Sequence, residues 1–410
     1  MSDGVVVSST RLRAELARSL SDLYGAEVPA YTTLVEVSGE VNTDVLAARD
    51  DAERFGTIER VTAERHGAIR LGTPDELAQV ARVFGACGMY PVGFYDLREA
   101  TPAVPVVSTA FRPLAREELA DNPFRVFTSL LVVDDRRFFD AALEAELREF
   151  LGARTLFPAE LLALADLMED QHELSASQAG RFLELATASF ALSPEPVDRV
   201  WYERLEQVSS VAADIGGVAS THINHLTPRV LDIDDLYARM GDRGIEMIDR
   251  IQGPPRTDGP DVLLRQTSFR ALAEPRTFRE PDGSIVVDSL RVRFGEVEAR
   301  GVALTPKGRE LYDAAGIDAF PTTDEQLDAL DLAYYGRDAS GRLVPIVYED
   351  FLPASAAGIF ASNLTGDGAM DATRTGATCD ASWLQDVLGR ELHDPYDLYA
   401  AERTSSRSGH

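Results

Sequence analysis

The sequence contains very little lysine and cysteine. Lys307 is the only lysine among its 40 basic residues, and the rest are arginines. A Schiff-base or pyridoxal-dependent enzyme needs a lysine amine, so this class is disfavoured. Cys87 and Cys379 stand alone and far apart, which excludes a disulfide framework and a cysteine zinc site.

Long apolar runs and an excess of basic residues are also missing. No stretch of about 18 apolar residues occurs, and the N-terminal segment lacks the basic start and apolar core of a signal peptide. The 68 acidic residues give a formal net charge of −28, which would repel nucleic acid and an anionic membrane. We therefore expect a cytoplasmic protein that binds neither.

The familiar nucleotide and nucleophile motifs are absent. The sequence has no GxxxxGK[S/T], GxGxxG, GxSxG or HExxH pattern. These absences disfavour nucleotide-dependent enzymes, serine hydrolases and HExxH metalloproteases.

The hydrophobic pattern predicts two β-containing halves around a helical middle. Helical periodicity is found near residues 9–25, 32–48 and 73–88, and the Ala- and Leu-rich segment from 134 onward is helical as well. Residues 65–97 read as a strand–helix–strand unit. Further apolar, β-branched segments predict strands at 104–114, 124–133, 222–233, 262–272 and 284–305.

We divide the 410 residues into four segments. Residues 1–133 would hold the N-terminal helices and the first half of a β core, and residues 134–215 a helical insert. Residues 216–313 would complete the core, and residues 314–410 would form a lid or buttress.

His222 and His225 lie in a segment that is predicted to be extended. A strand sends residues three apart to opposite faces, so we expect only one of the two to point inward. The alternation slightly favours His225, which shares its side with Ile223 and Thr227. The alternative is a core histidine hydrogen-bonded to a carbonyl group.

Glu296 continues an apolar alternation. From Leu290 to Phe294 the even positions are apolar and the odd ones are arginines, so the pattern sends Glu296 to the apolar face. A buried carboxylate must be protonated, paired with arginine or bound to a metal. Glu298 falls on the same side, but nearer the strand end, where it can reach water. A bulge at Gly295 is the alternative and would expose both glutamates.

His66 and Arg70 lie four residues apart in ERHGAIRLG. An internal arginine can hold a substrate carboxylate through two parallel hydrogen bonds, although a surface ion pair is the simpler alternative. His66 is ambiguous by itself. Two histidines and one carboxylate from separate strands, with positions left free for substrate and O2, are what a non-haem Fe(II) oxygenase requires.

Eight sequence blocks span most of the chain. They read ERHGAIRLGT, GMYPVGFYDL, STAFRP, PFRVFTSLL, HINHLTPRVLDID, LLRQTSF, RFGEVEARGVALTPKGRELYD and VYEDFLPASAAGIF. In number and order they resemble the 2-oxoadipate dioxygenase/decarboxylase family, also called 2-hydroxyglutarate synthases. The resemblance implies an α+β fold with a cupped mixed β-sheet core similar to that of vicinal oxygen chelate enzymes, with N-terminal and inserted helices.

The resemblance also implies roles for individual residues. Fe(II) would be the cofactor, held by His66 in RHGAIR, His225 in NHLTPR and Glu296 in RFGE. Arg70 would hold the distal carboxylate of the substrate.

Further residues would complete the substrate pocket. The backbone at Ala354 and Ser355 would close its far end, and Arg265 and Gln266 would support the site. Two departures from the family pattern put the preferred substrate length in doubt. The segment 314–346 is shorter than expected, and Ala354 stands where a larger aliphatic residue is expected.

The implied reaction converts 2-oxoadipate and O2 into 2-hydroxyglutarate and CO2 in lysine degradation, so the partners are a small 2-oxo acid and O2. One alternative keeps the iron chemistry and changes the 2-oxo acid. The other is a non-catalytic binding protein with structural zinc, which usually has four protein ligands where only three are found here. The sequence does not indicate the oligomeric state.

Overall fold

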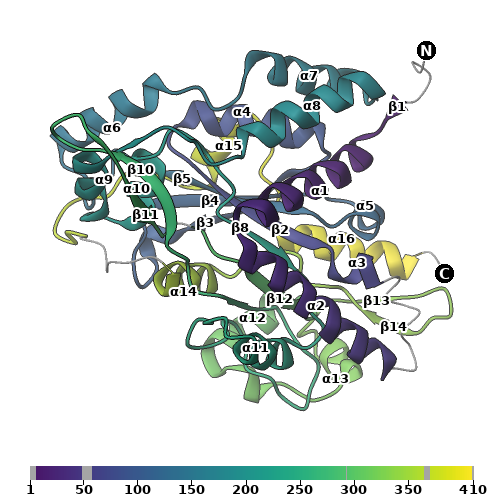
Figure 1. Cartoon of the computed structure of the whole chain (residues 1–410). Coiled ribbons are helices and arrows are strands. Elements are labelled where there is room, and N and C mark those ends of the chain that lie inside the picture. Colours follow the sequence, from purple (N-terminus) through teal and green to yellow (C-terminus); the bar gives the residue numbers. More distant parts are fainter. Residues whose placement is uncertain (1–5, 49–57, 292, 364–369, 409–410) are drawn as a thin grey trace.

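The structure is a computed structural model that describes residues 6–48, 58–291, 293–363 and 370–408 (Figure 1). A five-stranded mixed sheet forms its centre. The strands follow the order β3 (Tyr90–Asp96), β4 (Val106–Arg112), β5 (Arg125–Leu131), β2 (Glu64–Leu71) and β8 (His225–Pro228). Only β2 and β5 run parallel to each other, and the other neighbours are antiparallel.

The sheet continues beyond β8 through an isolated bridge. Arg229, just after β8, pairs with Glu298 of β12 (Glu296–Arg300), and the Val230 amide donates to the Glu298 carbonyl at 2.8 Å. Strand β12 is in turn antiparallel to β9 (Leu264–Ser268). The predicted α+β class with a mixed sheet core is confirmed.

Three smaller sheets surround this core. They consist of β1 (Val6–Val7) with β6 (Leu174–Ser175), of β7 (Val197–Asp198) with β10 (Glu274–Arg279) and β11 (Ile285–Leu290), and of β13 (Tyr335–Arg337) with β14 (Leu343–Pro345).

The N-terminal helices pack apolar stripes against the core. Helix α1 (Ser9–Glu27) is capped by the Ser8 side chain and buries Leu12, Leu16 and Leu20 at helical spacing. Helices α2 (Pro29–Ala47), α3 (Ile58–Thr62) and α4 (Pro74–Ala86) follow. A capping box between Thr73 and Glu76 begins α4.

Five helices separate β5 from β8, as the helical periodicity of this segment predicts. They are α6 (Ala141–Ala153), α7 (Ala159–Gln171), α8 (Ala176–Ser189), α9 (Arg199–Glu206) and α10 (Ser210–Gly216). In Figure 1, α7 and α8 lie along the top of the molecule, on the opposite side of the sheet from α11 and α13. The division into four segments stays a prediction.

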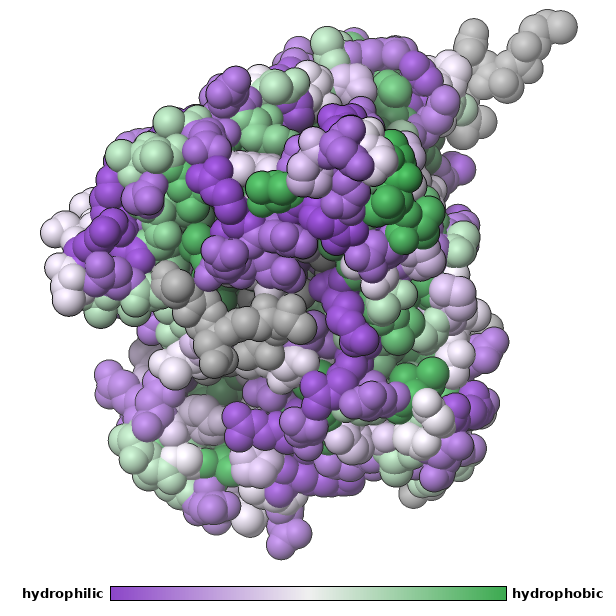
Figure 2. Space-filling model, turned by 60° about the vertical axis from the view of Figure 1, so that its left-hand side comes forward, coloured by the Kyte–Doolittle hydropathy of each residue, from purple (hydrophilic) through white to green (hydrophobic). Residues whose placement is uncertain are grey.

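The remaining helices connect strands or follow the core. They are η2 (Leu97–Glu99), α5 (Arg116–Asp121), α11 (Ile233–Asp242), α12 (Pro306–Ala315), η3 (Ile317–Ala319), α13 (Asp324–Ala329), α14 (Pro353–Asn363), α15 (Ala381–Leu388) and α16 (Pro395–Ser408). Within the described ranges, no helix combines the length and apolar character that crossing a bilayer requires. Hydrophilic residues dominate the face shown in Figure 2, with apolar residues in small patches.

Two strand predictions need correction. The segment 284–305 is not one strand, because β11 and β12 belong to different sheets and residues 291 and 293–295 between them are not in a strand. Arg293, predicted on a polar face, is buried and paired with Glu274 and Glu27. The predicted strand at 222–233 shrinks to the four residues of β8.

Candidate metal centre

Three strands bring His66, His225 and Glu296 together. His66 Nε2 lies 3.0 Å from Glu296 Oε1, and His225 Nε2 lies 3.8 Å from Glu296 Oε2. One potential ligand atom from each residue falls within 4.8 Å of the other two. All three side chains are buried, at no more than 4% exposure. Residues 230 positions apart in the chain thus form one compact cluster.

Strand register explains the convergence. On β2 and β8, His66 pairs with Thr227 and Ala68 pairs with His225. Residues that face each other across two strands share one side of the sheet, so both histidines point the same way. The small Ala68 side chain leaves room opposite His225. The Thr227 hydroxyl lies 3.1 Å from His66 Nε2 and 3.4 Å from Glu296 Oε1.

Helix α1 joins the two segments that carry His225 and Glu296. The Tyr24 hydroxyl lies 2.9 Å from the carbonyl oxygen of Asn224 and 2.8 Å from that of Phe294. A buried side chain of the first helix therefore fixes the backbone next to both residues.

The charges of the cluster suit a cation. The described partners of Glu296 are the two imidazoles, the Thr227 hydroxyl and the Gln266 amide, with no arginine or lysine among them. Burial alone would raise the pKa of Glu296, but the adjacent His225 and His66 lower it below its ordinary value. A buried carboxylate without arginine or lysine beside it needs a protonated imidazole or a metal ion to balance its charge.

The pKa values of the two imidazoles are shifted in opposite directions. Burial lowers the pKa of His225 to about 3, so this imidazole is neutral and can donate a lone pair to a metal. Burial also disfavours the charged form of His66, but Glu298 and Glu296 outweigh it and raise the pKa of His66 above its ordinary value. Metal binding would displace the proton that the two carboxylates favour there.

Glu298 does not reach water, contrary to the sequence prediction. Its side chain is fully buried, and Oε2 lies 2.8 Å from His66 Nδ1. Arg300 pairs with the same carboxylate, with Nη2 2.9 Å from Oε2. Because β12 begins at Glu296, alternation places 296, 298 and 300 on one side of the strand, and no bulge exposes either glutamate. Glu298 thus contacts His66 in the way that an acceptor commonly supports a histidine in a metal centre.

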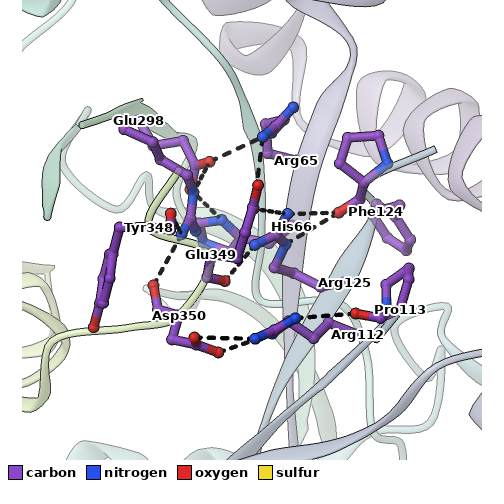
Figure 3. A network of polar contacts seen from close by, with 12 residues as sticks. Arg65, His66, Arg112, Pro113, Phe124, Arg125, Glu298, Tyr348, Glu349 and Asp350 are labelled. Atoms are coloured by element: carbon purple, nitrogen blue, oxygen red, sulfur yellow. Dashed lines mark hydrogen bonds and ion pairs between the residues drawn. The ribbon is translucent and has the colours of Figure 1, made fainter. Parts of the chain in front are cut away.

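An ion-pair network extends from Glu298 to the C-terminal segment (Figure 3). Arg300 Nη1 donates to the Tyr348 and Asp350 carbonyl groups, each at 2.9 Å. The Glu349 carboxylate lies 2.5 Å from Arg125 Nη2. The carboxylate of Asp350 accepts from Arg112 Nε at 2.9 Å. The segment before α14 is therefore held against the sheet beside the cluster.

Two aromatic rings cover the histidines. The rings of His66 and Phe351 meet edge to face with centroids 4.9 Å apart, and the rings of His225 and Phe294 stack at 5.0 Å. These apolar walls exclude water from one side of each imidazole.

Arg70 lies on the same side of β2 as His66 and is 4% exposed. Its Nη1 donates to the carboxylate of Asp214 in α10. His222 Nε2 lies 3.2 Å from the other Asp214 oxygen. His222 and His225 are both buried, so the expectation that only one of them points inward was wrong. The segment before β8 is not a regular strand, and simple alternation does not apply to it.

The other residues predicted to line or support the substrate pocket lie in different surroundings. Gln266 donates its amide to Glu296. Arg265 faces away and forms a two-bond ion pair with Asp234, at 2.8 and 3.1 Å. Ser355 is buried in the first turn of α14. Ala354 lies in the same turn, but its side chain lies outside the described residues.

Several residues around the cluster escaped the sequence analysis. Phe351 and Asp214 carry no local signal, because only the folded chain brings them to the histidines, and Thr227 was placed on the side of His225 without a role. Arg300 did have one, since it follows Glu296 and Glu298 at strand spacing and marks a charged, paired stripe.

The fold and the cluster together define a class. Two imidazoles and one carboxylate from three strands of a mixed sheet, buried and supported by hydrogen bonds, form a candidate mononuclear metal centre.

The comparisons agree with this class. The family model described as 2-oxoadipate dioxygenase/decarboxylase matches residues 16–363. A Mycobacterium tuberculosis protein named 2-oxoadipate dioxygenase/decarboxylase is 60% identical, over 98% of both chains. The chain belongs to the 2-oxoadipate dioxygenase/decarboxylase family.

Solved structures support the same assignment. The crystal structure of the hydroxyglutarate synthase from Pseudomonas putida in complex with 2-oxoadipate matches with a TM-score of 0.83 and 35% identity, covering 98% of this chain and 97% of that one. A putative glyoxalase superfamily protein from Ralstonia eutropha matches with a TM-score of 0.56 and 19% identity, covering 72% and 84%. This second likeness concerns the fold alone.

Proposed function

We propose that this protein is an Fe(II)-dependent dioxygenase that converts 2-oxoadipate and O2 into 2-hydroxyglutarate and CO2. The observation that carries the proposal is the buried cluster of His66, His225 and Glu296 in a chain of this family. One molecule of each reactant gives one molecule of each product, so the reaction balances without an external co-substrate.

The metal ligands would be the three residues of the cluster. Their donor set of two imidazole nitrogens and a carboxylate oxygen suits ferrous iron. When bound, iron supplies the reactivity towards O2 that side chains lack. Glu298 would keep the His66 ring oriented, and Phe351 and Phe294 would keep water from the imidazoles.

Arg70 would bind the far end of the substrate. A strand advances about 3.3 Å per residue, so the Cα atoms of His66 and Arg70 lie about 13 Å apart on one side of β2. The substrate would present its 2-oxo acid group to the metal and its distal carboxylate to Arg70. Ser355 and the backbone at Ala354 would close this end of the pocket.

Product analysis tests the proposal. We expect the iron-loaded protein, incubated with 2-oxoadipate in air, to form 2-hydroxyglutarate and CO2 in equal amounts while consuming equimolar O2. His66→Ala and His225→Ala should abolish product formation, whereas the exposed His172→Asn should not. Product formation that is equal in all four proteins, or absent from the iron-loaded wild type, would contradict the proposal.

A substrate series tests which 2-oxo acid is preferred. We expect turnover of 2-oxoadipate to exceed that of 2-oxohexanoate, because the latter lacks the distal carboxylate that Arg70 would bind. Comparison with 2-oxoglutarate and 2-oxopimelate measures the preferred chain length. Faster turnover of 2-oxohexanoate would contradict the role of Arg70.

A further inference from the structure

The C-terminal helix α16 places a buried tyrosine close to the segment that covers the candidate metal centre. Tyr399 is 3% exposed, and its hydroxyl donates to the carboxylate of Asp350. The same hydroxyl accepts from the backbone amide of Glu349 at 2.8 Å. One oxygen atom of α16 therefore holds both the backbone and a side chain of two successive residues. The match of the family model ends at residue 363, so this helix lies outside it.

The Tyr399 hydroxyl and Arg112 hold Asp350 from two sides. Arg112 donates to the Asp350 carboxylate from Nε at 2.9 Å and from Nη2 at 3.2 Å (Figure 3). Burial, followed by the charge of Asp350, raises the pKa of Tyr399 well above its ordinary value, so the hydroxyl keeps its proton. Without this hydroxyl, the buried amide of Glu349 would lose its acceptor, which is costly.

The position of this segment reaches the candidate metal centre through Arg300. Its Nη1 donates to the carbonyl groups of Tyr348 and Asp350, at 2.9 Å each. Its Nε and Nη2 donate to the carboxylate of Glu298, which lies 2.8 Å from His66 Nδ1. A displacement of the two carbonyl groups would therefore move the acceptor that orients the His66 ring.

Helix α16 is itself anchored on the core. In the segment that leads into it, the amide of His393 donates to the Pro91 carbonyl group at 3.0 Å. The carbonyl group of His393 accepts from the Gly93 amide at 2.9 Å. Further along α16, Arg403 pairs with Asp331 at 2.7 Å. A site is held precisely when its supports are rigid, and these contacts give the helix that rigidity.

We propose that Tyr399 is a positioning residue of the candidate metal centre, and that its hydroxyl acts on His66 through the hydrogen-bonded chain that ends at Glu298. This inference rests on the metal centre of the proposed function and extends the support of that centre to the C-terminal helix. The hydroxyl keeps the His66 ring in the orientation that a metal needs. The metal affinity of the folded protein therefore depends on it.

Tyr399→Phe tests the role of the hydroxyl, because phenylalanine keeps the ring and removes the oxygen alone. We expect the affinity for Fe(II) to fall about three- to tenfold, less than for the loss of a direct partner of the histidine. Competition with a chelator, without O2 and well below the unfolding temperature, measures the affinity of the folded protein.

Tyr396→Phe is the matched control. It lies at a half-buried position of the same helix, and its hydroxyl takes no part in the chain of hydrogen bonds, so wild-type affinity is expected. Unchanged affinity in Tyr399→Phe, or an equal loss in Tyr396→Phe, would overturn the inference. If Tyr399→Phe does not fold, Asp350→Asn replaces it, because asparagine keeps the shape of the side chain and weakens the acceptor of the hydroxyl.

A double-mutant cycle separates positioning from a merely structural role. If the hydroxyl acts through Glu298, Tyr399→Phe lowers the affinity for Fe(II) much less in a Glu298→Gln background than in the wild type. A hydroxyl that only stabilises the fold would have the same effect in both backgrounds. Losses that simply multiply would therefore overturn the inference.

Fe(II) binding by the wild type distinguishes this inference from the proposed function. If the wild type binds no Fe(II), both fail. If it binds Fe(II) and forms 2-hydroxyglutarate while Tyr399→Phe keeps wild-type affinity, the inference about Tyr399 alone fails. If it binds Fe(II) but forms no 2-hydroxyglutarate, the proposed reaction fails, and the affinities of the variants still decide the role of Tyr399.

Discussion

At the scale of single residues, Glu298 connects the candidate metal centre to the rest of the molecule. Its carboxylate accepts from His66 and is held from behind by Arg300. Such an acceptor fixes the tautomer of the histidine and the orientation of its ring. The charge of Glu298 is matched by Arg300, so Glu296 carries the charge that remains for a metal.

We predict that Glu298→Gln lowers the affinity for Fe(II) about 10- to 100-fold, because His66 loses its charged acceptor. Competition with a chelator of known affinity, well below the unfolding temperature, measures the change. Glu310→Gln, at an exposed position of α12, is the control and should retain wild-type affinity. Wild-type affinity in Glu298→Gln would contradict the orienting role.

The sequence predicted the residues of the cluster but not the burial of Glu298. His66, His225 and Glu296 could be singled out because histidines are few and a carboxylate on an apolar alternation is unusual. Glu298 was wrongly expected to reach water, because it stands near the end of a strand. Its burial depends on residues 348–351, which fold back over β12, and no local pattern announces that contact.

At the scale of elements, the start of β12 depends on Gly295. A Cβ atom there would lie 2.2 Å from Phe269 Cε1 and 3.0 Å from Leu34 Cδ2. Glycine lets the chain pass close to the Phe269 ring just before Glu296. The sequence pattern could not show this, because the alternation of letters continues across Gly295 although β11 and β12 lie in different sheets.

We predict that Gly295→Ala destabilises the protein by about 1 to 3 kcal/mol through overpacking and weakens metal binding. Gly180→Ala is the matched control. It lies at an exposed position of α8 with nothing within 4 Å of a new Cβ, and it should stabilise by up to about 1 kcal/mol. Urea unfolding measures both. Equal effects of the two substitutions would contradict the close approach at Gly295.

The ion pairs of Glu349, in the segment before α14, make the stability of the fold depend on pH. Burial alone would raise the pKa of Glu349. Arg125 and Arg65 outweigh burial and lower this pKa from the ordinary 4.5 to about 2. A lowered carboxyl pKa stabilises the fold above about pH 4.5, and this contribution is lost as the pH falls towards 2.

We predict that Glu349→Gln removes about 3 kcal/mol of stability at pH 7 and much less near pH 2. Unfolding by urea over a range of pH values measures the difference from wild type. A difference that stays constant down to pH 2 would show that Glu349 acts through packing instead of charge.

At the scale of the whole molecule, the candidate metal centre joins parts of the chain that helices α6 to α10 separate. An ion that binds the native cluster and not the unfolded chain stabilises the entire fold. The fold class was predictable from the order of helical and strand patterns together with the resemblance. The continuation of the sheet through Arg229 and Glu298 was not, because it depends on a single long-range bridge.

We predict that a stoichiometric excess of Fe(II), added without O2, raises the midpoint of thermal unfolding by several degrees, and that a chelator reverses the rise. His225→Ala should abolish the response, and the exposed His172→Asn should keep it. Asparagine suits the left-handed backbone of residue 172, whose φ is 60°. If the midpoint of thermal unfolding of the wild type does not change when Fe(II) is added, a native metal centre is contradicted.

The order of the three cluster residues along the chain also bears on biosynthesis. His66 and His225 leave the ribosome well before Glu296, and helices α6 to α10 are synthesised between the two histidines. A nascent chain would therefore complete the candidate metal centre only while its last third is being translated, and an ion for this centre would have to be available to a nearly complete polypeptide.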